Sequence, residues 1–149
     1  QQRRARIAAA TPPIDSPTCA TQDRRLRRNP RLGKLTTHVL DTAHGRAGAG
    51  MRVALHALDG HGARACLVEF VTNADGRCDV PLLEGDALKP GIYELAFAVG
   101  DYFADLGVAL PTPRFLDTVV LRVGIADANA HYHVPLLCSP WSYSTYRGS

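Results

Sequence analysis

Apolar and polar residues alternate along most of the chain with a period of two, the pattern of strands that bury one face. The clearest run spans residues 91–99, where one face holds Tyr93, Leu95, Phe97 and Val99. Further strands are expected at residues 35–40, 51–58, 64–72, 116–125, 132–137 and 141–146. Because helical periodicity is almost absent, the pattern predicts an all-β fold, an antiparallel β-sandwich.

Turn residues separate these runs. Residues 41–50 include three glycines and are expected to form a loop. Residues 59–62 predict a turn that joins the strands on either side into a hairpin. One short helical turn is expected at residues 101–106, with Asp101 as its N-cap.

Charge divides the 149-residue chain into two parts. Residues 1–34 hold eight arginines and one lysine against two aspartates, a net charge of +7, and also four prolines. We expect this part to be a disordered basic arm that precedes one domain at residues 35–149. That domain has eight basic and twelve acidic groups, a net charge of −4, which argues against a nucleic-acid partner.

Membrane and redox signals are weak. No apolar run approaches the length of a membrane span, so no membrane partner is expected. The four cysteines lack C-x-x-C spacing and are expected to be free thiols: Cys19, Cys66, Cys78 and Cys138. Free thiols suit a reducing compartment, and we expect a cytoplasmic protein. A peroxisomal location is the weaker alternative, because Arg31-Leu32 and His38-Val39 nearly match the spacing of an N-terminal peroxisomal signal.

The final segment, residues 131–149, is rich in ionisable and aromatic side chains. Within it, alternation places Tyr132, Val134 and Leu136 on one face of a strand. The opposite face then holds His131, His133 and Pro135. Two imidazoles are therefore expected to project from one strand whose other face is buried.

Three segments together resemble the 5-hydroxyisourate hydrolases, the enzyme branch of the transthyretin-like family: residues 33–53, 72–83 and 131–149. The terminal Tyr-Arg-Gly-Ser distinguishes this branch from the hormone carrier transthyretin. The resemblance implies two four-stranded sheets with one short helix, assembled as a homotetramer that is a dimer of dimers. It also implies hydrolysis of 5-hydroxyisourate to 2-oxo-4-hydroxy-4-carboxy-5-ureidoimidazoline in urate degradation, with no metal or other cofactor.

The same resemblance assigns catalytic roles to His38, Arg77 and His133. A neutral imidazole can accept a proton from water near neutral pH, so the two histidines are expected to transfer protons. Which of them is the base stays open. Arg77 is expected to stabilise the oxyanion that forms when water attacks an amide carbonyl. His131 shares the face of His133 and is expected either to orient it or to face another subunit.

The ending is expected to complete the pocket, with substrate-binding roles for Tyr146, Arg147 and Ser149. Arg147 is expected to pair with a carboxylate that pins the tail. Gly148 is expected to adopt a backbone conformation closed to other residues. Ser149 is the last residue of the sequence, and its α-carboxylate is expected to be part of the pocket.

Two other functions remain open at this stage. A transthyretin-like carrier would bind a small aromatic ligand in the channel of the tetramer without hydrolysing it. A zinc hydrolase would use His131, His133 and His38 as three ligands. The Tyr-Arg-Gly-Ser ending favours the hydrolase over the carrier, and no acidic or thiol ligand is spaced to complete the zinc site.

Overall fold

The structure is a computed structural model that describes residues 32–148. The predictions for residues 1–31 of the basic arm, for Cys19 and for Ser149 therefore concern residues outside the described range, whereas Lys34 at the end of the predicted arm belongs to the first strand. Within that range, no helix is long and apolar enough to cross a membrane. The three described cysteines are free.

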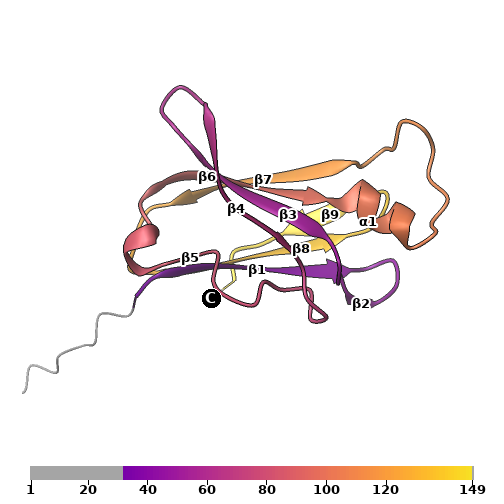
Figure 1. Ribbon diagram of the computed structural model, residues 1–149, viewed down its shortest axis with the longest axis horizontal. Helices are drawn as coiled ribbons and strands as arrows, with labels where there is room; N and C mark the ends of the chain where they lie inside the picture. The colour runs from indigo at the N-terminus through magenta and orange to yellow at the C-terminus, as the bar shows by residue number, and fades with distance from the viewer. Residues whose placement is uncertain (1–31, 149) are drawn as a thin grey trace, which may run out of the picture.

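Short strands are the main regular structure of the described chain, which also has one α-helix and one 3-10 turn (Figure 1). The strands are β1 (Lys34–Asp41), β2 (Arg46–Ala47), β3 (Arg52–Leu58), β4 (Arg64–Val71), β5 (Leu83–Glu84), β6 (Gly91–Ala98), β7 (Thr118–Ile125), β8 (His131–Cys138) and β9 (Tyr143–Thr145). The 3-10 turn is η1 (Gly85–Ala87), and α1 (Val99–Asp105) follows β6.

These strands form two layers. One sheet has the order β4-β3-β6-β7 and is antiparallel throughout. The other has the order β2-β1-β8-β9, and β5 also pairs with β1. The predicted sandwich with one short helix is confirmed, but this second sheet has five strands rather than four. The additional strands β2 and β5 are only two residues long, too short to show an alternating pattern.

One strand pair departs from the antiparallel rule. β1 and β8 run parallel, in a register that pairs Lys34 with His131 and Asp41 with Cys138. Alternation predicts which face of a strand is buried, but it is the same for parallel and antiparallel neighbours. The parallel pairing is therefore a property of the topology that the sequence pattern did not predict.

The core lies between the sheets and follows the predicted alternation. Burial alternates strictly along β1, and its inward side chains Leu35 and Val39 are fully buried. Cys138 is fully buried among them and acts as a small apolar residue. Pro135 is also buried, although alternation placed it on the outer face. It lies on a central strand opposite His38, and the hydroxyl of Thr145 on β9 donates to its carbonyl.

The predicted N-cap of the helix is wrong. Helix α1 begins at Val99 after Ala98, and no side chain caps it. Asp101 lies in the first turn of the helix instead, where its carboxylate binds Arg52 and Arg114. Two guanidinium groups compete with the helix N–H groups for this carboxylate, which explains the change of role.

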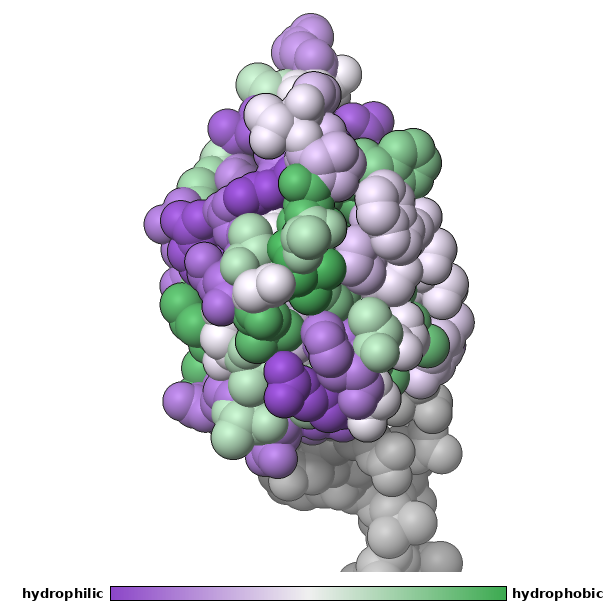
Figure 2. Space-filling view, turned by 90° about the vertical axis from the view of Figure 1, so that its right-hand side faces the viewer, coloured by the Kyte–Doolittle hydropathy of each residue, from purple (hydrophilic) through white to green (hydrophobic). Residues whose placement is uncertain are grey.

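Exposed apolar side chains gather at the end of the molecule that holds α1. Phe115 and Trp141 are 70% and 57% exposed, and their ring centroids lie 6.2 Å apart. Figure 2 shows this end, where apolar residues form a strip between polar ones. The chain therefore presents apolar surface away from its core.

Candidate active site

The outer face of the β1–β8 pair brings the two predicted histidines together. The register places Thr36 beside His133 and His38 beside Pro135. Because His38 is two residues beyond Thr36, both side chains leave β1 on the same face as His133. The ring centroids of His38 and His133 lie 6.5 Å apart. The sequence separation of nearly one hundred residues is thus bridged by a single strand pairing.

A tight turn at residues 73–77 delivers Arg77 to the same place. The side-chain oxygen of Asn73 accepts hydrogen bonds from the backbone N–H groups of Asp75, at 3.0 Å, and Arg77, at 3.1 Å. The turn docks on β1, where the N–H of Val39 donates to the carbonyl of Gly76 at 2.8 Å. Arg77 then forms an isolated antiparallel bridge with His38.

Gly76 permits this docking for two reasons. Its φ is +73°, in the left-handed region that other residues avoid. A Cβ atom there would also lie 2.4 Å from the carbonyl oxygen of Val39. The turn can approach β1 closely only because this residue has no side chain.

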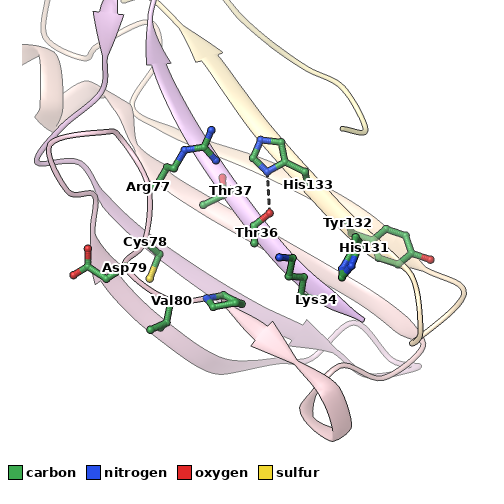
Figure 3. Close-up of a pocket in the computed structure, with 11 residues that line it drawn as sticks. Lys34, Thr36, Thr37, Arg77, Cys78, Asp79, Val80, His131, Tyr132 and His133 are labelled. Atoms are coloured by element: carbon green, nitrogen blue, oxygen red, sulfur yellow. Dashed lines mark hydrogen bonds between the residues drawn. The ribbon is translucent and has the colours of Figure 1, made fainter. Parts of the chain in front are cut away.

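A groove of about 510 Å³ opens between this turn and the β1–β8 pair. Its lining residues are Lys34, Thr36, Thr37, Arg77, Cys78, Asp79, Val80, Pro81, His131, Tyr132 and His133. Figure 3 shows the guanidinium of Arg77 and the ring of His133 facing each other at one end of the groove. His38 does not line the groove itself, and its ring lies beside that of His133. The volume suits a small-molecule ligand.

The surroundings of both imidazoles favour the neutral form. Burial lowers the pKa of His133 below its usual value, the positive charge of Arg77 lowers it further, and a proton on His38 would also oppose a charge on His133. Burial and the charge of Arg77 likewise lower the pKa of His38, against a smaller opposing effect from Asp75. Neutral imidazoles beside a fixed guanidinium can take up a proton while the cation stabilises an anion.

The C-terminal segment packs against His133. The N–H of Gly148 donates to the carbonyl of His133 at 2.8 Å. A Cβ atom at Gly148 would lie 2.8 Å from Cδ2 of the His133 ring. The φ of Gly148 is not positive, so the expectation of an unusual backbone conformation is wrong. Glycine is required here by close packing on the imidazole.

Of the other predicted binding residues, Arg147 contacts a residue of the groove and Tyr146 does not line the groove. The guanidinium of Arg147 lies over the ring of Tyr132, 4.6 Å from its centroid. Tyr146 is 58% exposed and does not line the groove. The structure therefore brings together His38, Arg77 and His133, but does not bring Tyr146 to them within one chain.

The sequence analysis did not identify two polar residues of the groove. Thr36 contacts His133, and Lys34 pairs in register with His131 at the other end. Both occupy the same face of β1 as His38, at spacings of two and four residues, so alternation could have indicated them. Among residues 32–148, no three His, Cys, Asp or Glu side chains are arranged to hold a metal ion.

Comparisons with known proteins identify a family for the chain. The sequence model of the HIUase/transthyretin family matches residues 35–148. A 5-hydroxyisourate hydrolase from Ralstonia nicotianae is 61% identical over 118 residues, which are 79% of this chain and 100% of that protein. The structure of Klebsiella pneumoniae 5-hydroxyisourate hydrolase is similar with a TM-score of 0.65 and 32% identity, over 78% of this chain and 99% of that one. A crystal structure of (S)-allantoin synthase gives a TM-score of 0.75 and 49% identity, over 79% of this chain but only 44% of the synthase.

Proposed function

Because the chain belongs to the HIUase/transthyretin family, we propose that it is an enzyme that hydrolyses 5-hydroxyisourate. The product is 2-oxo-4-hydroxy-4-carboxy-5-ureidoimidazoline, which places the reaction in urate degradation. The observation that carries the proposal is the 61% identity over the whole length of a relative named 5-hydroxyisourate hydrolase. The groove between Arg77 and His133 supplies a site that fits this chemistry.

The reaction adds water across a ring amide bond. One imidazole of the His38–His133 pair removes a proton from the attacking water, whose oxygen bonds to the amide carbonyl carbon. The carbonyl oxygen becomes an oxyanion, and the Arg77 guanidinium stabilises it. The C–N bond then breaks, and the leaving nitrogen receives a proton. The ring opens and the carbonyl carbon becomes a carboxyl group.

The C-terminal residues bind the substrate in this proposal. Arg147 is held by its cation–π contact with Tyr132, a residue that lines the groove. Tyr146 and Ser149 contribute from the same segment when chains associate. The active unit in this proposal is a homotetramer, a dimer of dimers. Its support is that β7 and β9 are the edge strands of their sheets, and that apolar side chains such as Phe115 are exposed.

Turnover of freshly generated 5-hydroxyisourate, followed by ultraviolet absorbance, tests the function. We expect rapid hydrolysis by the wild type and a loss of about 100-fold or more in His133→Ala and in Arg77→Ala. His61→Ala, which removes an exposed histidine from the β3–β4 turn, is the matched control and is expected to retain full activity. Treatment with a chelator is expected to leave the rate unchanged, because the assigned groups need no metal.

Two outcomes would contradict this function. Wild-type rates in both His133→Ala and Arg77→Ala would remove these residues from the mechanism. Tight binding of a hydrophobic hormone without hydrolysis of 5-hydroxyisourate would favour the carrier instead.

A further inference from the structure

Thr36 makes a direct side-chain contact with the imidazole of His133. Its Oγ1 lies 2.9 Å from Nδ1 of the ring, in a partly buried position. The two residues are register partners in the parallel β1–β8 pair, so the backbone of two central strands sets their separation. Neither the proposed proton transfer nor the proposed oxyanion site uses Thr36. Its hydroxyl is therefore a polar group in the groove with a defined partner and no assigned role.

Gly148 restrains the same ring from the C-terminal segment. The ring atoms Cδ2 and Cγ of His133 lie so close to Gly148 that a Cβ there would be 2.8 and 3.2 Å from them. A flipped ring would exchange Nδ1 for Cδ2 and lose the contact with Thr36. The contact with Thr36 thus favours one flip state of the imidazole, and Gly148 limits how far the ring can shift.

In this orientation the second ring nitrogen faces the groove. Figure 3 shows Nδ1 of His133 directed at Thr36 and the other nitrogen on the side of Arg77. A guanidinium attracts a lone pair and repels an N–H group, so the charge of Arg77 favours an unprotonated Nε2. In a neutral imidazole the proton then resides on Nδ1 and needs an acceptor. The hydroxyl oxygen of Thr36 is that acceptor, and its own proton can go to solvent because Thr36 is only half-buried.

We propose that Thr36 is a positioning residue: its hydroxyl oxygen accepts the Nδ1–H of His133 and leaves the Nε2 lone pair directed at the groove beside Arg77. This inference rests on the proposed hydrolase function and deepens it, because it assigns the role of general base to His133. It corresponds to the general rule that the partner of one ring nitrogen determines what the other nitrogen can do.

The direction of this hydrogen bond predicts a direction of change in the pH profile. Within residues 32–148, the charged and titratable groups around His133 are Arg77 and His38, together with groups farther along the groove or in the adjoining tail: Lys34, Cys78, Asp79, His131, Tyr132 and Arg147. A bond from Nδ1–H persists in the imidazolium and stabilises it. Loss of the hydroxyl therefore moves the acid limb of kcat/KM to lower pH. If the hydroxyl donated to Nδ1 instead, its loss would move the limb to higher pH.

Three variants of the full chain test the role in turnover. Thr36→Val keeps the shape of the side chain and is expected to lower kcat about 10- to 100-fold, the usual cost of losing the partner that orients a histidine. KM is expected to change little. Thr36→Ser keeps the hydroxyl and is expected to restore most of the rate. Thr42→Val is the matched control, because Thr42 donates to the Cys138 carbonyl at the far end of the same strand pair.

A measurement without substrate separates this inference from the proposed function. Nitrogen-15 chemical shifts of the histidine rings, assigned with His133→Ala, report which nitrogen carries the proton. We expect a protonated Nδ1 and a bare Nε2 in the wild type, and a mixture of tautomers in Thr36→Val. A bare Nδ1, an acid limb that moves to higher pH, or an unchanged rate in Thr36→Val would each overturn the inference. A wild type that does not hydrolyse 5-hydroxyisourate would refute the proposed function instead.

Discussion

At the scale of single residues, the site depends on partial burial of its two imidazoles and on the charge of Arg77 beside them. His38 and His133 are partly buried, and the nearest fixed charge that lowers the pKa of both is the guanidinium of Arg77. Both effects disfavour the imidazolium, so each histidine is neutral at pH 7. Each also stays neutral when the pH falls somewhat below the usual pKa of histidine. Arg77 therefore has two effects, one on the developing oxyanion and one on the protonation of the base.

The first prediction concerns the acid limb of the pH profile. Because the neutral imidazole is the active form, kcat/KM is expected to hold as pH falls through the ordinary histidine value near 6.5 and to decline only below it. Arg77→Gln removes a charge that lowers the pKa, so the limb is expected to move to higher pH. The shift is expected to be partial, because burial remains the first cause.

Arg77→Lys is the control, since it keeps the charge and is expected to leave the limb near its wild-type position. Activity is expected to fall in both variants because the planar fork is lost, so the limb rather than the rate is the readout. A limb that does not move in Arg77→Gln would show that Arg77 does not control the protonation of the base.

The second prediction concerns the packing of Gly148 on His133. Gly148→Ala is expected to displace the imidazole and to lower kcat by about tenfold or more, because small errors in position are costly in catalysis. The melting temperature is expected to change little, since the residue lies outside the core. Gly124→Ala is the control, because a Cβ at Gly124 meets only Ile92 at an ordinary 3.7 Å. Equal activity in both variants would contradict the close contact.

Individual residues also show how far sequence alone could go. Alternation correctly predicted that His38 and His133 leave their strands on the outer face. It indicated Thr36 equally well, but threonine is so common in strands that its type gave no reason to select it. The contact of Gly148 with the imidazole depends on a chain path that no local pattern contains.

At the scale of elements, the turn at residues 73–77 acts as one unit with β1. Its hydrogen bonds are local, from the N–H groups of Asp75 and Arg77 to the side-chain oxygen of Asn73, whereas its docking on Val39 depends on Gly76. The element therefore positions Arg77 through backbone contacts, which a substitution of the arginine itself would not disturb.

The third prediction tests this docking. Gly76→Ala is expected to destabilise the fold by about 1–3 kcal/mol and to displace Arg77, with a large loss of activity. Urea unfolding and kcat/KM measure the two effects. Gly45→Ala is the matched control, because Gly45 also has a positive φ, +65°, but a Cβ there meets nothing within 4 Å. It is expected to lose some stability and little activity. Similar activities in the two variants would argue against the docking contact.

The elements themselves were largely predictable. Most long strands begin and end within about two residues of the expected bounds, because apolar and polar residues alternate along them. Strands such as β1 bury the apolar face, whereas β4 is exposed along most of its length. The helix was expected about two residues too late, because Asp101 resembled a cap but binds two arginines. The parallel direction of β8 against β1 was not predictable, because it depends on how the chain crosses between the two sheets.

At the scale of the whole molecule, the proposed tetramer would complete the groove with residues of a second chain. The groove has polar residues at both ends, and Tyr146 is exposed and does not line it in a single chain. Association across the outer face of β1 and β8 would cover this groove and bring a second chain to it. The family assignment was predictable from three short motifs, whereas contacts between chains are not encoded in any single motif.

The fourth prediction is that activity depends on assembly. Light scattering is expected to give the mass of four chains at high concentration. In a dilution series, specific activity is expected to fall as the mass falls, because the dissociated chain has an incomplete site. A carrier protein in every sample controls for loss on surfaces. A single chain with full specific activity would contradict the proposed tetramer.

The parallel pairing of β1 with β8 also has a consequence for biosynthesis. Thr36 and His133 are 97 positions apart, so the strand that contributes one must wait for nearly all of the remaining chain to be translated. Contacts of such long range form slowly, because a large loop must close before they stabilise anything. A nascent chain on the ribosome can form the β3–β4 hairpin early, but the reactive centre can form only after the residues of β8 have been translated and have left the ribosome.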